Sequence, residues 1–116
     1  MGRLTTHVLD LSTGRPAEAV AIELWRMDAE PVMLARVLTN GDGRTDVPLV
    51  EGDAFTAGRY QLVFHAGDYF RSRDAAGIEP PFLDRIPIAF GVADASPHLH
   101  VPLLLSPYGY STYRGS

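Results

Sequence analysis

Three histidines are the side chains in this sequence best suited to moving protons near neutral pH. His98 and His100 are two residues apart in an alternating run, so on a strand both point the same way, roughly 6.6 Å apart. His7 lies on the matching face of the first alternating run. These spacings predict one acid–base site, against the alternative that each histidine is a half-buried residue with its own partner. The fourth histidine, His65, we interpret as structural or solvent-facing.

Other common catalytic groups are missing from the sequence. None of the 116 residues is a cysteine, which excludes disulfides, thiolate catalysis and cysteine-bound zinc. A zinc hydrolase built from His7, His98 and His100, with an open position for water, is the alternative that uses the same three side chains. We find no carboxylate pattern that would support such a zinc site, and we expect no metal.

Short strands must position these histidines. The pattern of alternating residues predicts strands over 4–9, 20–25, 32–38, 44–49, 59–66, 86–92, 98–106 and 108–114. Residues 67–76 predict one short helix, with Gly77 as its stop. Short strands separated by turns, with one small helix, predict a mostly β protein: an antiparallel β-sandwich in a single domain over 1–116.

The first and seventh predicted strands are apolar on both faces, which a monomeric sandwich would avoid. The face that carries the histidines also carries four apolar residues: Leu9, Leu11, Pro102 and Leu104. Because the sequence offers no helix to cover this face, a partner subunit is the simplest cover. The alternative is an irregular strand with a few exposed leucines.

Charge and hydropathy exclude two classes of partner. The net charge of -4 argues against nucleic acid, whose binding proteins usually carry a basic patch. No run of about eighteen apolar residues is present, so we expect no membrane span. The first residues show no apolar segment typical of a signal peptide, and we expect a cytoplasmic protein.

Both ends of the chain resemble a known family. Leu-Thr-Thr-His-Val-Leu-Asp at 4–10 and Gly-Arg-Pro-Ala at 14–17 resemble the opening of the transthyretin-like family, and residues 98–116 resemble its ending. Asn40–Thr45 is similar to the family's arginine-bearing loop. The final Tyr-Arg-Gly-Ser is the tetrapeptide that separates 5-hydroxyisourate hydrolases from hormone-carrying transthyretins. One departure is Leu99, where a tyrosine is common, but this position points to the core.

The resemblance implies a sandwich of two four-stranded sheets with one short helix. It also implies a homotetramer, a dimer of dimers, with active sites in the clefts where the dimers meet. The catalytic residues that it implies are His7, Arg44, His100 and Ser116. It implies substrate binding by His7, Arg44, Tyr113, Arg114 and Ser116, support from His98 at the mouth of the cleft, and no cofactor. A non-catalytic carrier of small ligands is the alternative, although hormone carriers have a lysine where this chain has His7.

The implied reaction opens the six-membered-ring amide of 5-hydroxyisourate to give 2-oxo-4-hydroxy-4-carboxy-5-ureidoimidazoline. The chain has neither a thiol nor a Gly-x-Ser-x-Gly segment, so direct attack by water fits better than an acyl-enzyme. His7 and His100 are the candidate bases, with their two roles left open. Arg44 offers a fork of donors for a carbonyl and its developing oxyanion, and Ser116 offers a hydroxyl or its α-carboxylate.

Overall fold

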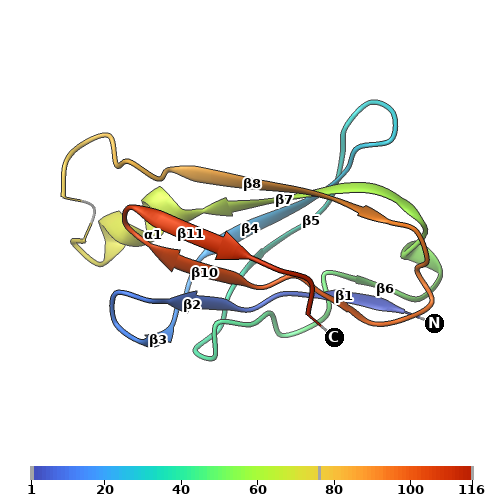
Figure 1. Ribbon diagram of the computed structural model, residues 1–116, viewed down its shortest axis with the longest axis horizontal. Helices are drawn as coiled ribbons and strands as arrows, with labels where there is room; N and C mark the ends of the chain where they lie inside the picture. The colour runs from blue at the N-terminus through green and yellow to red at the C-terminus, as the bar shows by residue number, and fades with distance from the viewer. Residues whose placement is uncertain (1, 76, 116) are drawn as a thin grey trace.

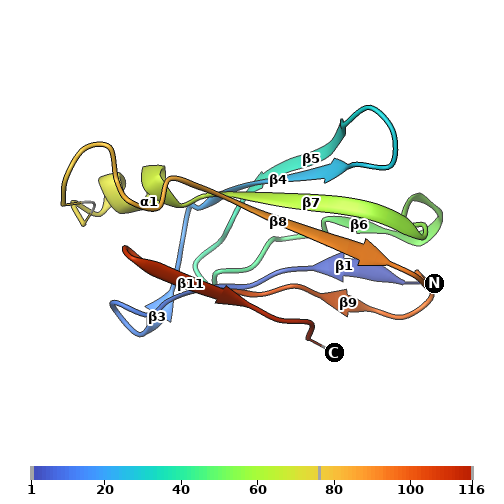
Figure 2. The same cartoon turned by 45° about the horizontal axis from the view of Figure 1, so that its top comes forward.

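The computed structural model describes residues 2–75 and 77–115, which form two packed β-layers (Figures 1 and 2). One layer is a sheet with the strand order β5-β4-β7-β8. Its strands are β4 (Ala21–Arg26), β5 (Val32–Leu38), β7 (Gly58–His65) and β8 (Arg85–Val92), and all neighbours pair antiparallel. These strands agree closely with the predicted ones because each alternates strictly between buried and outward residues.

The second layer is built from the two ends of the chain. It contains the order β6-β1-β9 and, beside it, β11-β10-β2-β3. The strands are β1 (Arg3–Thr5), β2 (Val8–Asp10), β3 (Arg15–Pro16), β6 (Val50–Glu51), β9 (Leu99–His100), β10 (Leu103–Ser106) and β11 (Gly109–Thr112). Hydrogen bonds from Val101 N to Thr5 O (3.0 Å) and from Leu103 N to His7 O (2.9 Å) join the two halves. The interruption falls where Pro102 has no N–H to donate. The predicted β-sandwich is therefore confirmed.

Strand direction in this layer differs from the expected antiparallel arrangement. β1 pairs with β9 in parallel, with Leu4 opposite Leu99, and β2 pairs with β10 in parallel, with Val8 opposite Leu103. Antiparallel neighbours are commonly joined by tight hairpins, whereas these strands are separated by the whole opposite layer, so no turn forces them to reverse.

The inward faces of the end strands supply the core, as the alternation predicts. Leu4, Val8, Leu103 and Leu105 have no exposed surface, and Leu99 is 8% exposed. They pack with buried residues of the opposite layer: Ile22, Leu24, Leu62 and Phe64. On the outward face Leu9 and Leu104 are half-buried and Leu11 is 53% exposed, whereas Pro102 is already buried within the chain.

The short helix is α1, which covers Ala66–Ser72 and so ends before the predicted limit. Asp74 adopts a left-handed φ of 53°, Asp74 N donates to Arg71 O (3.1 Å), and Ala75 N donates to Phe70 O (2.8 Å). These two bonds form a Schellman ending, which terminates the helix before Gly77 is reached. The described part of the chain contains no helix long and apolar enough to cross a membrane.

The strand predicted over 44–49 is wrong. This segment is a loop, and pairing begins only at β6, where Val50 lies opposite Leu4. Side chains of the loop bond to the loop itself, as in the hydrogen bond from Thr45 Oγ1 to Val47 O (2.5 Å). The loop therefore leaves Arg44 outside the sheet, next to the chain ends that carry the histidines.

Candidate active site

Neighbouring strands bring His7 and His100 to the same region, from opposite ends of the sequence. His7 lies between β1 and β2, and His100 is the last residue of β9. Thr5 is the partner of His100 across the parallel pair, and the backbone oxygens of Thr5 and His7 accept hydrogen bonds from the strand that follows His100. Both histidines are half-buried, while His98 is exposed. The structure therefore places the predicted histidines along one pair of strands.

The loop that carries Arg44 is fixed by Asn40 and attached to the strand beside His7. The Asn40 side-chain oxygen accepts from Asp42 N (2.9 Å) and Arg44 N (3.2 Å), and Asn40 N donates to Arg44 O (2.7 Å). Val8 N donates to Gly43 O at 2.8 Å. Gly43 has a φ of +73°, and a Cβ there would lie 2.4 Å from Val8 O and 3.2 Å from His7 Cδ2, so only glycine allows this close approach.

Burial and positive charge keep both histidines neutral. Burial lowers the pKa of His7 below its usual 6.5, and the Arg44 guanidinium lowers it further, while the backbone carbonyl and carboxylate of Asp42 oppose the shift. Burial also lowers the pKa of His100, followed by the charges of Arg44, His7 and His98. A neutral imidazole can accept a proton, so the arrangement favours two bases beside a fixed cation.

Thr5 is a site residue that sequence reasoning missed. Its hydroxyl lies 2.7 Å from His98 Nε2 and 2.8 Å from His100 Nδ1, so it bridges the two rings. The available signal was its position two residues before His7, which puts it on the same outward face of the first strand. The strand pairing that sets it opposite His100 was not readable from the sequence.

The C-terminal segment is attached to His100. Gly115 N donates to His100 O at 2.7 Å, forming an antiparallel bridge between these residues. A Cβ on Gly115 would lie 2.9 Å from His100 Cδ2 and 3.2 Å from its Cβ, so this glycine packs directly against the imidazole. The predicted role of Ser116 lies outside the described residues.

Two hollows flank this bridge. One, of about 430 Å³, is lined by Arg3, Thr5, Arg44, Asp46, His98 and His100. The other, of about 720 Å³, is lined by Tyr113, Arg114 and Gly115 together with His98 and His100. The structure thus places Tyr113 and Arg114 beside the histidines, with Tyr113 58% exposed.

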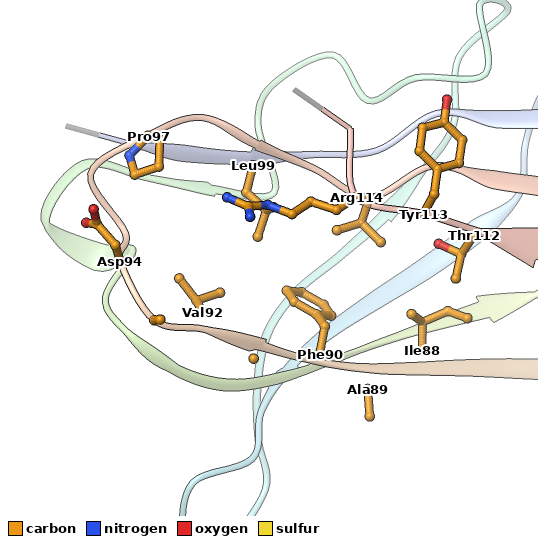
Figure 3. Close-up of a pocket in the computed structure, with 13 residues that line it drawn as sticks. Ile88, Ala89, Phe90, Val92, Asp94, Pro97, Leu99, Thr112, Tyr113 and Arg114 are labelled. Carbon is orange, nitrogen blue, oxygen red and sulfur yellow. The ribbon is translucent and has the colours of Figure 1, made fainter.

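A third hollow, of about 560 Å³, lies between β8 and the end of the chain (Figure 3). Ile88, Phe90, Val92 and Leu99 point into it, and Thr112, Tyr113 and Arg114 border it. None of the histidines lines this hollow, and its lining is mainly apolar. We therefore place the chemistry in the two histidine-lined hollows.

His65 is structural, as one of our two interpretations has it, and it is not solvent-facing. Its side chain is 5% exposed, and its Nε2 contacts Glu23 Oε2 at 2.5 Å. Trp25 Nε1 donates to the other Glu23 oxygen at 2.8 Å. The Trp25 bond, and next the His65 bond, lower the pKa of Glu23, with burial opposing them. This cluster lies on the opposite layer and belongs to the packing of the sheet.

The geometry does not support a three-histidine zinc site. Within residues 2–75 and 77–115, no group of three or more histidine or acidic side chains is arranged to hold a metal ion. Thr5 already occupies one nitrogen of His98 and one of His100. The rings are therefore oriented toward a hydroxyl bridge and not toward a common centre.

A two-layer sandwich with an acid–base site on the outer face of its chain-end strands defines a transthyretin-fold protein equipped for chemistry. The sequence matches the HIUase/Transthyretin family over residues 4–115, and the chain belongs to this family. The family assignment drawn from the terminal motifs is thereby confirmed.

Relatives within the family are similar over their whole length. The 5-hydroxyisourate hydrolase 2 of Rhizobium meliloti (strain 1021) is 60% identical over 116 residues, covering 99% of this chain and 97% of the relative. The structure of Klebsiella pneumoniae 5-hydroxyisourate hydrolase superposes with a TM-score of 0.84 at 38% identity, covering 100% of this chain and 94% of that one. The crystal structure of (S)-allantoin synthase gives a TM-score of 0.95 at 44% identity, covering 99% of this chain but 44% of that chain.

Proposed function

We propose that this chain is a 5-hydroxyisourate hydrolase that uses water as the nucleophile. The observation that carries the proposal is the pair of histidines whose pKa values are lowered beside Arg44, at the place where the chain end is attached. Full-length relatives with this activity in their names support the substrate. A carrier would need neither neutral bases nor a cation positioned between them.

The reaction adds water across one amide bond. An imidazole, from His7 or His100, takes a proton from water as its oxygen attacks the ring carbonyl carbon. Arg44 donates hydrogen bonds to the oxyanion that forms, where a positioned donor is worth on the order of a hundredfold in rate. When the carbon–nitrogen bond breaks, the protonated imidazole returns its proton to the leaving nitrogen. The histidines end as they began, and the product carries a carboxylate.

Tyr113, Arg114 and Ser116 complete this proposed site. Tyr113 and Arg114 border the hollow that His98 and His100 also line, where a guanidinium and a phenol suit the polar edge of a purine-derived ring. Ser116 follows Gly115, whose backbone is bonded to His100, so its hydroxyl or carboxylate is available to substrate or to a histidine.

The decisive experiment mixes the purified protein with freshly prepared 5-hydroxyisourate and follows its ultraviolet decay. We expect the decay to exceed the spontaneous rate and to be unchanged by EDTA, because the base is an imidazole. No acceleration would refute the hydrolase and favour the carrier. Loss of activity with EDTA, restored by zinc, would instead support the metal-dependent alternative.

Deletion of Ser116 tests the chain end separately. The deletion removes no core side chain, so unfolding free energy should change by less than about 1 kcal/mol. If Ser116 acts in the site, turnover should fall while the fold is retained. Circular dichroism before and after the deletion provides the control, and full turnover in the deleted chain would remove Ser116 from the site.

The same proposal includes a homotetramer. Leu11 is 53% exposed, with Leu9 and Leu104 half-buried on the same outward face as the histidines. Covering this face with a second copy would bury apolar surface and enclose the site. Analytical ultracentrifugation at micromolar concentration should report about four chains. An active, stable monomer would refute a site completed by a partner subunit.

A further inference from the structure

The hydroxyl of Thr5 occupies a position that the proposed reaction does not yet use. We propose that Thr5 is a positioning residue: its hydroxyl, held between His98 and His100, keeps the proton of His100 on Nδ1 and so leaves Nε2 bare to act as the base. This inference rests on the proposed function for its kinetic consequence, but the proton arrangement itself is a property of the free protein.

The number of available protons limits how the bridge can form. A threonine hydroxyl has one hydrogen to donate and can also accept, and a neutral imidazole has one N–H and one bare nitrogen. Thr5 Oγ1 is within hydrogen-bond distance of both His98 Nε2 (2.7 Å) and His100 Nδ1 (2.8 Å). Since it can donate to only one of them, the other nitrogen must carry a proton and donate to Thr5.

Two arrangements of neutral rings keep the hydroxyl donating, and they differ in which histidine is the base. In the first, His100 Nδ1–H donates to Thr5, and Thr5 donates to His98 Nε2. In the second, His98 Nε2–H donates to Thr5, and Thr5 donates to His100 Nδ1. Only the first leaves His100 Nε2 without a proton. The tautomers of the two rings are therefore coupled through one hydroxyl.

The surroundings favour the first arrangement. Gly115 packs against the Cδ2 side of the His100 ring and Thr5 holds Nδ1, which leaves Nε2 as the nitrogen available to a ligand. The charged groups around His100 are Arg44, His7 and His98, with Arg3, Asp46 and Arg114 also lining the two hollows. A cation such as Arg44 attracts a bare lone pair and repels an N–H, so it favours an unprotonated Nε2.

Two variants at Thr5 isolate the hydroxyl. Thr5→Val keeps the branched shape and removes the hydrogen bond, whereas Thr5→Ser keeps the hydroxyl. Thr6→Val is the matched control, since Thr6 is the next threonine but points inward and donates to Val101 O at 2.7 Å. His98→Phe removes the other end of the bridge at an exposed position, so it tests the coupling even if Thr5→Val fails to fold.

The first measurement is the nitrogen-15 spectrum of the imidazoles in the free protein, at a pH where His100 is neutral. We expect His100 to carry its proton on Nδ1 in the wild type and in Thr5→Ser. Thr5→Val and His98→Phe should shift the proton toward Nε2, and Thr6→Val should not. A wild-type His100 protonated on Nε2, or a tautomer that ignores both Thr5→Val and His98→Phe, would overturn the inference.

The second measurement is the pH profile of 5-hydroxyisourate hydrolysis. Thr5→Val should lower kcat by about tenfold or more with little change in KM, because the base is present but in the wrong tautomer. Thr5→Ser should restore most of this loss, which a purely structural role of the methyl group would not explain. Unchanged kcat in Thr5→Val would contradict the inference. A wild-type protein with no activity would instead refute the proposed function and leave the spectroscopic result intact.

Discussion

Adding a single methyl group at Gly115 should disable the site without disturbing the fold. In Gly115→Ala the new Cβ would lie 2.9 Å from His100 Cδ2, 3.2 Å from its Cβ and 3.4 Å from its Cγ. Favourable carbon–carbon contacts begin at about 3.5 Å, so the ring or the chain end must move by roughly half an ångström or more. Either movement displaces His100 from the substrate or breaks the bond from Gly115 N to His100 O.

The expected magnitude follows from how strictly catalysis depends on position. A displacement of about 1 Å in a catalytic group can cost on the order of a hundredfold, so we expect kcat/KM to fall about 10- to 100-fold. A hundredfold loss corresponds to about 2.7 kcal/mol in the activation barrier. Unfolding free energy should change by less than about 1 kcal/mol, because no core side chain is altered.

The assay compares initial rates of 5-hydroxyisourate decay with urea unfolding curves on the same preparations. Gly91→Ala is the control, since a Cβ there would meet nothing within 4 Å, and its kcat/KM should equal that of the wild type. Wild-type kcat/KM in Gly115→Ala, with the His100 ring unmoved, would refute the reasoning that the chain end positions this histidine.

Three further predictions concern the same site and its control cluster. Arg44→Ala should lower kcat/KM by about a hundredfold or more, whereas Arg36→Ala, an exposed arginine on β5, should leave it unchanged. The acid limb of wild-type kcat/KM should lie below pH 6.5, because the pKa values of His7 and His100 are both lowered and a base stays active until it is protonated. Removing the Arg44 guanidinium should raise both pKa values and move that limb to higher pH, and an unmoved limb would contradict the assignment. His65→Ala should reduce unfolding free energy by about 1–3 kcal/mol, because its buried glutamate partner loses a hydrogen bond, yet leave kcat/KM near wild type.

The sequence was informative wherever a local rule decides the structure. The alternation of Leu4 and Val8, and of Leu103 and Leu105, predicted which face of each strand is buried, because successive side chains on a strand point to opposite faces. The terminal motifs identified the family, and residue chemistry alone singled out the histidines. Where two local signals competed, the prediction was less accurate: the helix ends at Asp74 because its left-handed φ forms the cap before Gly77.

Only the tertiary structure decided how the two ends of the chain meet. The parallel register sets Thr5 opposite His100, and the bridge from Thr5 to His98 joins residues 93 positions apart in the sequence. The loop over 44–49, predicted as a strand, instead leaves Arg44 free to approach both histidines. Residue types and spacing fix which face a side chain takes, but the partner across a strand pair depends on the packing of the entire opposite layer. The acid–base site is built from those long-range pairings, since a hydrogen bond requires two groups within about 3 Å whatever their distance along the chain.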